Sequence, residues 1–338
     1  MGKLFKFLFL LIGGGGVAVL VMGAALFWYL HQPLPMRHEM SDFTVERGFS
    51  MRQTAGAIVD SGVDIHPEVL YWLARGTGKA NSIVAGSYEM YRGVTPWQLM
   101  LKLSLGDVSQ GRITLTEGWT FRQVRQAIEA LPDLQQDTAG ISEAELLRLI
   151  EAPYAHAEGL FFPDTYLYDK QSNASALFRR AWHMMENRLG QAWLQRSDNL
   201  PLQTPYEALI LASIIEKETG QAGERDLVSS VFINRLRIGM KLQTDPTVIY
   251  GLGDKLSGRL RRIHLDTDHE YNTYTRTGLP PTPIAMPGWA SLLAAVNPPD
   301  SPYLYFVARG DGSSEFSRTL TEHNHAVNRY QRQRQNVK

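Results

Sequence analysis

A strongly apolar run in the second half of the chain ends in two glutamates, Glu216 and Glu218. The run reads LILASIIEKET over residues 209 to 219, and Glu218 follows Ile215 and Ile214 by three and four residues. A helix with 3.6 residues per turn therefore places Glu218 on the apolar face. A carboxyl group in apolar surroundings is desolvated, which disfavours its charged form and suits it to donate a proton at neutral pH. Glu218 is the first candidate for a catalytic acid.

Glu216 lies on a more polar line of the same helix, together with Ala212 and Ser213. We expect its carboxylate to contact neighbouring backbone or a basic side chain such as Arg235, and we keep Glu216 as the alternative acid. A plainer interpretation also fits the pattern. Both glutamates could be solvated charges at the end of a helix, because glutamate is usually exposed.

Polar residues that suit a binding cleft follow in short loops. The sequence QTDP places three of them before a proline and a β-branched stretch, which predicts a fixed turn, and the sequence YNTY supplies two more. The loop GLPPTPIAMPG, residues 278 to 288, contains four prolines and is predicted to form a rigid wall. Such side chains suit the hydroxyl and acetamido groups of sugars. The candidate substrate-binding residues are Gln243, Thr244, Asp245, Asn272 and Tyr274, and the alternative role of Asp245 is that of a turn former.

The composition excludes several other chemistries. The chain has no cysteine, which removes thiol catalysis, cysteine-based zinc sites and disulfides. His323 and His325 are two residues apart and diverge on a helix, so we expect no metal ligands there. Neither a GxSxG nor an SxxK motif supports serine hydrolysis. Lys plus Arg and Asp plus Glu both number 34, so no net charge points to nucleic acid. We expect neither a metal nor a cofactor.

The N-terminal region carries an uncharged segment from Phe7 to Leu30. This segment exceeds the roughly 20 residues that a helix needs to cross a bilayer. Lys3 and Lys6 precede it and the aromatic sequence FWY closes it, which is typical of a single-pass helix with a cytoplasmic N-terminus. The rest of the chain is then expected outside the cytoplasm. A cleaved signal peptide, with small residues at 23 to 25, is the alternative.

A short sequence pattern occurs three times after this segment. VERGFSMRQTAGAI at 45 to 58 aligns without a gap with LTEGWTFRQVRQAI at 115 to 128, and a weaker copy, GVTPWQLMLKL, begins at residue 93. Each copy is predicted to be a strand, a glycine turn and a helix with Ser or Thr as its N-cap. The turn glycines are Gly48, Gly93 and Gly118, and the caps are Ser50, Thr95 and Thr120. We interpret the repetition as shared architecture and not as a catalytic feature.

The first copy, together with the closing sequence SYEMYRGVTPWQLMLKL, resembles a LysM-type module. Such modules bind glycans that contain N-acetylglucosamine. The resemblance implies a unit that positions the protein on a polysaccharide. A spacer without a ligand is the alternative.

Several motifs in a fixed order resemble the endolytic murein transglycosylase family, also called YceG-like. The resemblance extends from the N-terminal segment to about Tyr330 and is densest after residue 206. The motifs are EGLFFPDTY, LASIIEKET, RDLVSSVFINRLRIGMKLQTDPTVIYGLG, YNTYTRTGLPP, PIAMPG and YLYFVA. Thr282 and Met286 depart from the family's pattern, which commonly has glycine and a polar residue at these positions. The substrate contacts of that loop therefore stay open.

The resemblance implies a bacterial inner-membrane enzyme, with its catalytic part in the periplasm, that cuts nascent peptidoglycan strands internally and can end their elongation. The family's catalytic glutamate corresponds to Glu218. It is expected to protonate the oxygen between N-acetylmuramic acid and N-acetylglucosamine and then, as a base, to help close a 1,6-anhydro ring. The expected partners are peptidoglycan glycan strands and peptidoglycan synthases.

Two other functions stay open. One is a catalytically silent, membrane-anchored glycan-binding scaffold of the cell-wall machinery, and the other is a muramidase that uses water, with Asp245 as the second carboxylate. The expected fold is α+β, with a single transmembrane helix, a LysM-like small α/β subdomain and a mixed α+β catalytic domain. The predicted segments are a cytoplasmic tail (1–6), the transmembrane anchor (7–30), a linker (31–41), the LysM-like subdomain (42–106), a second repeat-like and helical subdomain (107–204) and the YceG-like catalytic domain (205–338).

Overall fold

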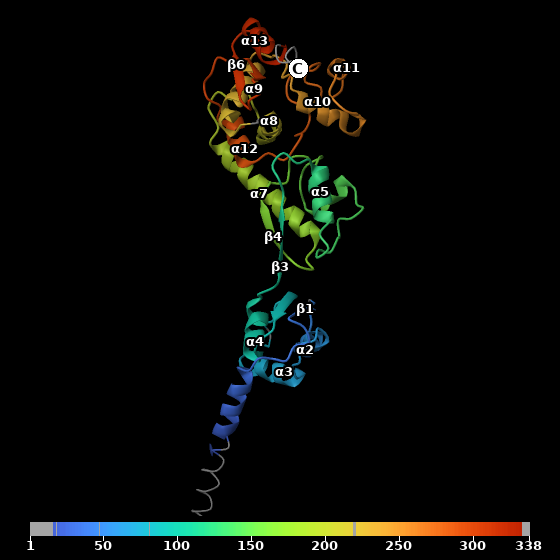
Figure 1. Cartoon of the computed structure of the whole chain (residues 1–338), viewed down its shortest axis with the longest axis vertical. Helices are drawn as coiled ribbons and strands as arrows, with labels where there is room; N and C mark the ends of the chain where they lie inside the picture. The colour runs from blue at the N-terminus through green and yellow to red at the C-terminus, as the bar shows by residue number, and fades with distance from the viewer. Residues whose placement is uncertain (1–15, 18, 47, 81, 219–220, 333–338) are drawn as a thin grey trace, which may run out of the picture. The chain divides into compact units, whose positions relative to one another are not determined.

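The computed structural model describes residues 16–17, 19–46, 48–80, 82–218 and 221–332 of the 338-residue chain (Figure 1). The chain divides into two compact units, one formed by Met1–Gly111 with Leu167–Ser172, the other by Arg112–Tyr166 with Asn173–Lys338. The chain passes from one unit to the other at three places, one within strand β3 (Gln110–Thr114), one within its partner β4 (Thr165–Asp169) and one after Ser172. The predicted domain boundaries after residues 106 and 204 stay predictions.

The first unit combines a two-stranded sheet with helices. Its strands run antiparallel, with Met40 opposite Tyr91 and Val45 opposite Gly86. Exposed and buried residues alternate along the first strand, because successive side chains of a strand point to opposite faces. The elements are β1 (Met40–Val45), α2 (Met51–Asp60), α3 (Pro67–Gly76), β2 (Gly86–Tyr91) and α4 (Pro96–Leu105).

The core of the first unit lies between this sheet and its helices. Phe43 and Tyr88 stack on neighbouring strands with ring centroids 5.6 Å apart. Ile58, Leu70 and Leu99, one from each of the three helices, are fully buried in the same cluster. A core of this kind needs no disulfide, in agreement with the lack of cysteine.

The second unit is mainly helical. Its helix α12 contacts α7, α8 and α9, and α8 also contacts α7 and α9. Residues 208 to 215 of α8 are all buried, so α8 is a core helix that is apolar on every side. The helices are α5 (Phe121–Glu129), α6 (Glu143–Leu149), α7 (Ala174–Leu194), α8 (Pro205–Glu218), α9 (Arg225–Arg237), α10 (Asp245–Leu252), α11 (Arg262–Asp266), α12 (Trp289–Val296) and α13 (Leu320–Val327), and strand β5 (Tyr305–Ala308) pairs antiparallel with β6 (Ser314–Ser317).

All three copies of the repeated pattern fold as predicted. β1 leads into α2, β2 into α4 and β3 into α5. Ser50, Thr95 and Thr120 each accept a hydrogen bond from the backbone N–H three residues on, and a glutamine there bonds back to the cap. The φ angles are +89° at Gly48, +101° at Gly93 and +77° at Gly118. The residues that the copies share are therefore those that the turn and the cap require.

The mixed α+β class predicted from the sequence is confirmed, since the described residues combine helices with three two-stranded sheets. Residues 19 to 30 are helical and expose apolar side chains, among them Leu20, Phe27 and Trp28. Within the described part of the chain, no helix is long and apolar enough to cross a bilayer. The predicted span of residues 7 to 30 begins outside the described residues, and the membrane helix stays a prediction.

Candidate active site

Glu218 ends the core helix α8 and is partly exposed there. Ile214 and Ile215, one turn earlier, have no exposed surface. The predicted contrast with a more polar line is wrong, because Ala212 and Ser213 are equally buried. The carboxyl group therefore follows a helix that is buried all round, and it lies near the negative end of the helix dipole, where an ionised carboxylate is disfavoured.

The surroundings of Glu218 favour the protonated form of its carboxyl group. The hydroxyl of Thr244 donates a hydrogen bond to its Oε1. Burial raises the pKa of Glu218, and the negative charge of Asp245 adds to this effect, while the Thr244 hydrogen bond and the positive charge of Arg235 oppose it without cancelling it. A raised pKa of this kind favours the part of a general acid, which has to hold its proton until the substrate takes it.

Thr244 is fixed for this contact by a buried cluster of threonines. It precedes α10, but its hydroxyl makes no capping bond to the helix, so the hydroxyl is free to meet Glu218. Its backbone N–H donates to Thr273 Oγ1 at 3.0 Å, and its carbonyl accepts from Thr247 Oγ1 at 2.8 Å. The backbone on both sides of the Thr244 side chain is therefore held.

Gln243 and Asp245, which flank Thr244, both have exposed side chains. Gln243 has a φ of +50°, a left-handed conformation that costs a residue other than glycine about 1–3 kcal/mol. The hydroxyl of Tyr274 donates to Asp245 Oδ1 at 2.6 Å. The structure thus brings four of the predicted site residues together beside Glu218 and leaves two of their side chains open to a ligand.

Asn272, the fifth predicted cleft residue, is fully buried. Its side-chain amide donates to the carbonyls of Leu265 and Thr267 at 3.0 and 2.7 Å. Its side-chain oxygen accepts the backbone N–H of Tyr274 at 2.9 Å. These bonds use the side chain to hold the turn that carries Tyr274, so its geometry supports a positioning role and not a sugar contact.

Glu216, the alternative acid, is engaged by backbone and by a different arginine from the one expected. Its Oε2 accepts from the N–H of Gly288 at 3.0 Å and from the hydroxyl of Ser291 at 2.7 Å. Its Oε1 lies 4.0 Å from Arg225 Nη2. The expected contact with backbone is confirmed, whereas the prediction that Arg235 is the basic partner of Glu216 is wrong. Sequence proximity could not have distinguished the two arginines, because both lie on α9.

Arg235 instead supports the site from inside the fold. Its guanidinium donates to the carbonyls of Leu304 and Leu242 at 2.7 and 2.6 Å and lies 5.2 Å from the ring centroid of Tyr305. It is the positive charge that acts on the pKa of Glu218. Arg235 therefore connects three parts of the structure close to the Glu218 carboxyl group. They are helix α9, the segment that precedes α10, and strand β5.

The turn of the second repeat copy lies on the end of α8. The amine of Lys217 donates to the carbonyl of Gly118 at 3.2 Å. The side chain of Glu117 lies directly against Gly288. A Cβ atom at position 288 would be 1.8 Å from Glu117 Oε1. Burial raises the pKa of Glu117, and the negative charge of Glu216 raises it further. This turn, which we interpreted as architecture alone, is thus built into the surroundings of the acid helix.

The proline-rich loop is packed as a wall against the same helix. The N–H of Ile284 donates to Ser213 Oγ at 2.9 Å, and Met286 exchanges backbone bonds with Trp119 and Gly118 at 2.7 and 2.8 Å. Thr282 and Met286, the two departures from the family pattern, are buried. Both side chains therefore act in the packing of the wall.

A second buried carboxyl group, that of Glu158, was missed by the sequence reasoning. Its side chain is 6% exposed, and its oxygens accept from the N–H of Phe121 at 2.9 Å and from the hydroxyl of Tyr250 at 3.1 Å. Burial raises the pKa of Glu158 to about 7, although these hydrogen bonds oppose the change. The available signal was a glutamate at the head of the apolar sequence GLFF.

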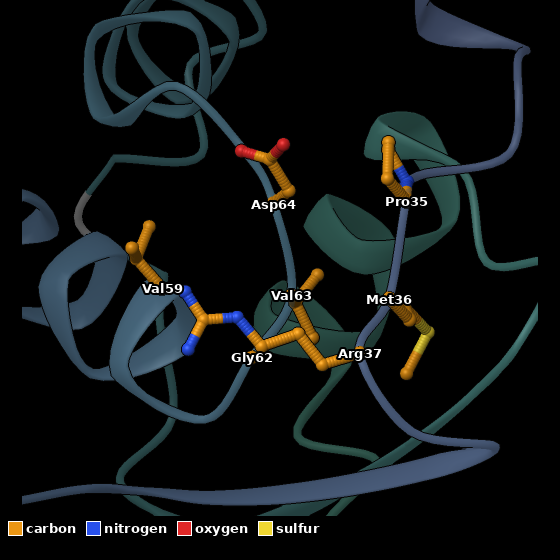
Figure 2. Close-up of a pocket in the computed structure, with 7 residues that line it drawn as sticks. All are labelled: Pro35, Met36, Arg37, Val59, Gly62, Val63 and Asp64. Atoms are coloured by element: carbon orange, nitrogen blue, oxygen red, sulfur yellow. The ribbon is translucent and has the colours of Figure 1, made fainter.

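A separate pocket of about 290 Å³ lies in the first unit (Figure 2). The backbone bonds from Arg37 N–H to Gly62 and from Asp64 N–H to Pro35, 3.0 and 2.9 Å long, join its two sides. The side chains of Arg37 and Asp64 bring opposite charges to it. The lining residues are Pro35, Met36, Arg37, Val59, Gly62, Val63 and Asp64. Across the described residues of both units, no group of three or more His, Cys, Asp or Glu is placed to hold a metal ion.

Comparison with known proteins gives a consistent result. The profile of the YceG-like family matches residues 43–329. An endolytic murein transglycosylase of Bacillus subtilis (strain 168) is 31% identical over 268 residues, which are 74% of each chain. An endolytic murein transglycosylase of Streptococcus pneumoniae serotype 2 strain D39 is 26% identical over 298 residues, 78% of this chain and 53% of the other. The chain thus spans about half the length of this streptococcal relative.

A solved structure agrees with this result. It is a yceG-like protein from Listeria monocytogenes, with 27% identity and a TM-score of 0.54, and the match covers 85% of this chain and 98% of the other. A carboxyl group with a raised pKa at the end of a buried helix suits acid catalysis on a polar substrate. The chain belongs to the YceG-like family, and the recognition made from its motifs is confirmed.

Proposed function

We propose that the chain is a lytic transglycosylase that cuts peptidoglycan glycan strands internally, with Glu218 as its catalytic residue. The activity is supported by the family and by the name endolytic murein transglycosylase that its curated relatives carry, which agrees with the function and enzyme class predicted from the sequence. One observation carries the assignment of the residue. The carboxyl group of Glu218 ends the core helix α8, has a raised pKa and is bound by Thr244.

In the first step Glu218 acts as a general acid. Its proton passes to the oxygen that links C1 of N-acetylmuramic acid to N-acetylglucosamine. The C1–O bond breaks with its electron pair on the departing oxygen, and positive charge develops at C1. Glu218 is left as a carboxylate, and the Thr244 hydroxyl stabilises the charge on its Oε1.

In the second step Glu218 acts as a base. The C6 hydroxyl of the same muramic residue attacks C1 and gives its proton to the carboxylate, which restores the acid. The product carries a 1,6-anhydro ring, and no water is consumed. Because the nucleophile belongs to the substrate, one carboxyl group suffices where ordinary glycosidases use two.

The neighbouring residues take different parts in this reaction. Gln243 and Asp245 have exposed side chains beside Glu218, and we assign them contacts with the sugar. Tyr274 holds Asp245 through a 2.6 Å hydrogen bond. Thr244 orients the acid, and Asn272 holds the turn that carries Tyr274.

Product analysis tests this proposal. The full chain in detergent is incubated with uncrosslinked glycan strands, beside Glu218→Gln, and the ends are identified by mass spectrometry. Ends that are one water lighter than the reducing form, absent with the variant, support transglycosylation by Glu218. Hydrated ends indicate a muramidase and direct attention to Asp245, and bound but uncut strands indicate a scaffold.

The matched control is Glu216→Gln. Glu216 lies on the same helix, but its Oε2 is engaged by Gly288 and Ser291. We expect this variant to give anhydro ends at a reduced rate. Complete loss of cutting with Glu216→Gln, together with activity in Glu218→Gln, would transfer the acid role to Glu216.

We propose further that a single N-terminal helix anchors the chain in the inner membrane and leaves the catalytic part in the periplasm, near peptidoglycan synthases. Support comes from the uncharged segment of residues 7 to 30 and from the exposed apolar side chains of Leu20, Phe27 and Trp28. Flotation of the expressed chain with membranes that resist alkaline extraction tests the anchor. Crosslinking in intact cells tests the synthases, and recovery of no synthase would remove that partner class.

For the LysM-like unit we propose glycan binding in the pocket of Figure 2, which this unit shares with the predicted linker and where Arg37 and Asp64 can bond to sugar hydroxyls. Titration of the inactive Glu218→Gln chain with N-acetylglucosamine oligomers tests this role. Weaker binding after Arg37→Ala supports it, and unchanged binding in that variant argues for a spacer.

A further inference from the structure

Glu158 joins three segments of the second unit. Its Oε1 accepts the N–H of Phe121, the first residue of α5, and its Oε2 accepts the hydroxyl of Tyr250 on α10. The next residue, Gly159, lies so close to the proline-rich wall that a Cβ there would come 2.4 Å from Pro283 Cβ. The buried carboxyl group thus joins α5 to α10, and the residue after it packs against the wall.

Tyr250 lies near the C-terminal end of α10, and the residues that contact Glu218 or lie beside it are at the N-terminal end of the same helix. Thr244, which precedes it, bonds to Glu218, and Asp245 is its first residue. Tyr250 follows Asp245 by five residues, a distance of about 8 Å along a helix. A helix this short moves as one body, so a displacement of Tyr250 reaches Thr244.

The side of α10 near Tyr250 is supported by further rings and hydroxyls. Tyr250 packs edge-on against Tyr271 with centroids 5.0 Å apart, and the Tyr271 hydroxyl bonds to Thr282 at 2.9 Å. Thr282 belongs to the wall. The Tyr250 hydroxyl has a raised pKa, mainly through burial, and stays a neutral donor to Glu158.

Both oxygens of Glu158 act as acceptors in this arrangement, which an ionised carboxylate satisfies. A protonated carboxyl group is a donor through one oxygen and a weaker acceptor there, so the hydrogen bond at that oxygen is weakened or reversed. Burial raises the pKa of Glu158 to about 7, with a contribution from the charge of Glu143 on α6, while the N–H groups of Phe121 and Gly159 and the Tyr250 hydroxyl favour the ionised form. Tyr206 of α8 and Tyr271 also face this carboxyl group.

We propose that Glu158 is a positioning residue whose ionised carboxylate holds α10 in the place where Thr244 and Asp245 meet Glu218. The inference rests on the proposed function, because it assigns Glu158 a part in the same reaction. Activity then falls at low pH, because protonation of Glu158 weakens the hydrogen bond that positions α10. This fall occurs although Glu218 is better protonated at low pH. The acid limb of the pH profile belongs to Glu158, and the alkaline limb belongs to Glu218.

The test combines kinetics with a signal that needs no turnover. For the full chain, kcat and KM are measured between about pH 5 and 9. The backbone amide of Thr244 is followed by NMR over the same range, after selective labelling of threonine with ¹⁵N. In the wild type we expect both kcat and the Thr244 amide to titrate near neutral pH, with KM changed less than kcat.

Three variants decide the outcome. Glu158→Gln should lose the acid limb and flatten the Thr244 titration. Tyr250→Phe removes the hydrogen bond that links Glu158 to α10, so it should also flatten the acid limb and the Thr244 titration. Tyr154→Phe is the matched control, because it removes another hydrogen bond from tyrosine to carboxylate, the 2.9 Å bond to Glu186, and should leave both midpoints unchanged.

An acid limb and a Thr244 titration that persist in Glu158→Gln overturn the inference. If that variant does not fold, Tyr250→Phe decides, and an acid limb and a Thr244 titration that match those of the wild type overturn it. A wild type without turnover contradicts the proposed function separately, since the Thr244 signal still tests whether Glu158 controls the position of α10.

Discussion

The first and second copies of the repeated pattern have the same local structure and different surroundings. Both consist of a strand, a glycine with positive φ and a helix with a capping box. A Cβ at Gly48 would have no heavy atom within 4 Å, whereas one at Gly118 would lie 3.8 and 3.9 Å from the side chains of Lys217 and Glu216. The shared residues determine the turn and the cap, and the neighbours determine which copy takes part in the site.

The contact of the second copy with α8 gains its importance from the acid at the end of that helix. We therefore expect the largest effect from Glu218→Gln, which keeps the size of the side chain and removes its proton. The kcat should fall by about 10²–10⁴-fold with little change in the unfolding midpoint. Steady-state kinetics and thermal unfolding measure the two quantities, and a loss of activity that is matched by a loss of folding would contradict the assignment.

The second copy also has an ionisable partner at the start of its helix, since Phe121 N–H bonds to Glu158. The pKa of Glu158 is raised to about 7 in the folded chain, so the folded state holds this proton more tightly than the unfolded state. Stability from this group is present in acid and is lost as the pH rises from the unfolded value toward 7. The wild type should lose about 3 kcal/mol relative to Glu158→Gln across this range.

Urea unfolding of both chains at about pH 4.5 and 8 measures this difference. The comparison uses the change between the two pH values, so that any constant effect of the substitution cancels. A difference in the free energy of unfolding that is the same at both pH values would contradict the raised pKa.

Substitution of the turn glycines compares the two copies directly. Gly48→Ala and Gly118→Ala both place a side chain at a positive φ, so each should lower the free energy of unfolding by about 1–2 kcal/mol. Gly118→Ala should also lower kcat several-fold, because its turn bonds to Lys217 and Met286. Equal effects of the two substitutions on kcat would remove the distinction between the copies.

Substitution of the N-cap residues should give the smallest difference between the two copies. Ser50→Ala and Thr120→Ala should each cost about 1 kcal/mol of stability, because each removes one capping bond. Only Thr120→Ala should reduce kcat, by about twofold, since α5 also begins at the N–H that Glu158 accepts. Denaturant unfolding and initial rates measured on both variants check this prediction.

The sequence predicts those features whose causes are local. The turn glycines, the caps and the strand–turn–helix order all depend on residues within a few positions of one another, and they are confirmed. The motifs identify the family because several of them occur in one order. The sequence singles out Glu218 by its helical spacing from Ile214 and Ile215, and its role as the acid stays a prediction that the product analysis tests.

Features that depend on distant segments could not be predicted. Glu216 meets a backbone N–H that is 72 residues away, at Gly288. Glu158 and Tyr250 are separated by 92 residues. Periodicity also fails for α8, because a helix that is buried on every side has no single apolar face.

The close approach of Glu117 to Gly288 has an evolutionary consequence. A Cβ at position 288 would overlap the Glu117 carboxyl group, so the two positions share one small volume. A homologue that carries alanine or a larger residue at 288 should have a shorter side chain than glutamate at 117. We expect the two positions to covary across the family, although they are distant in the sequence.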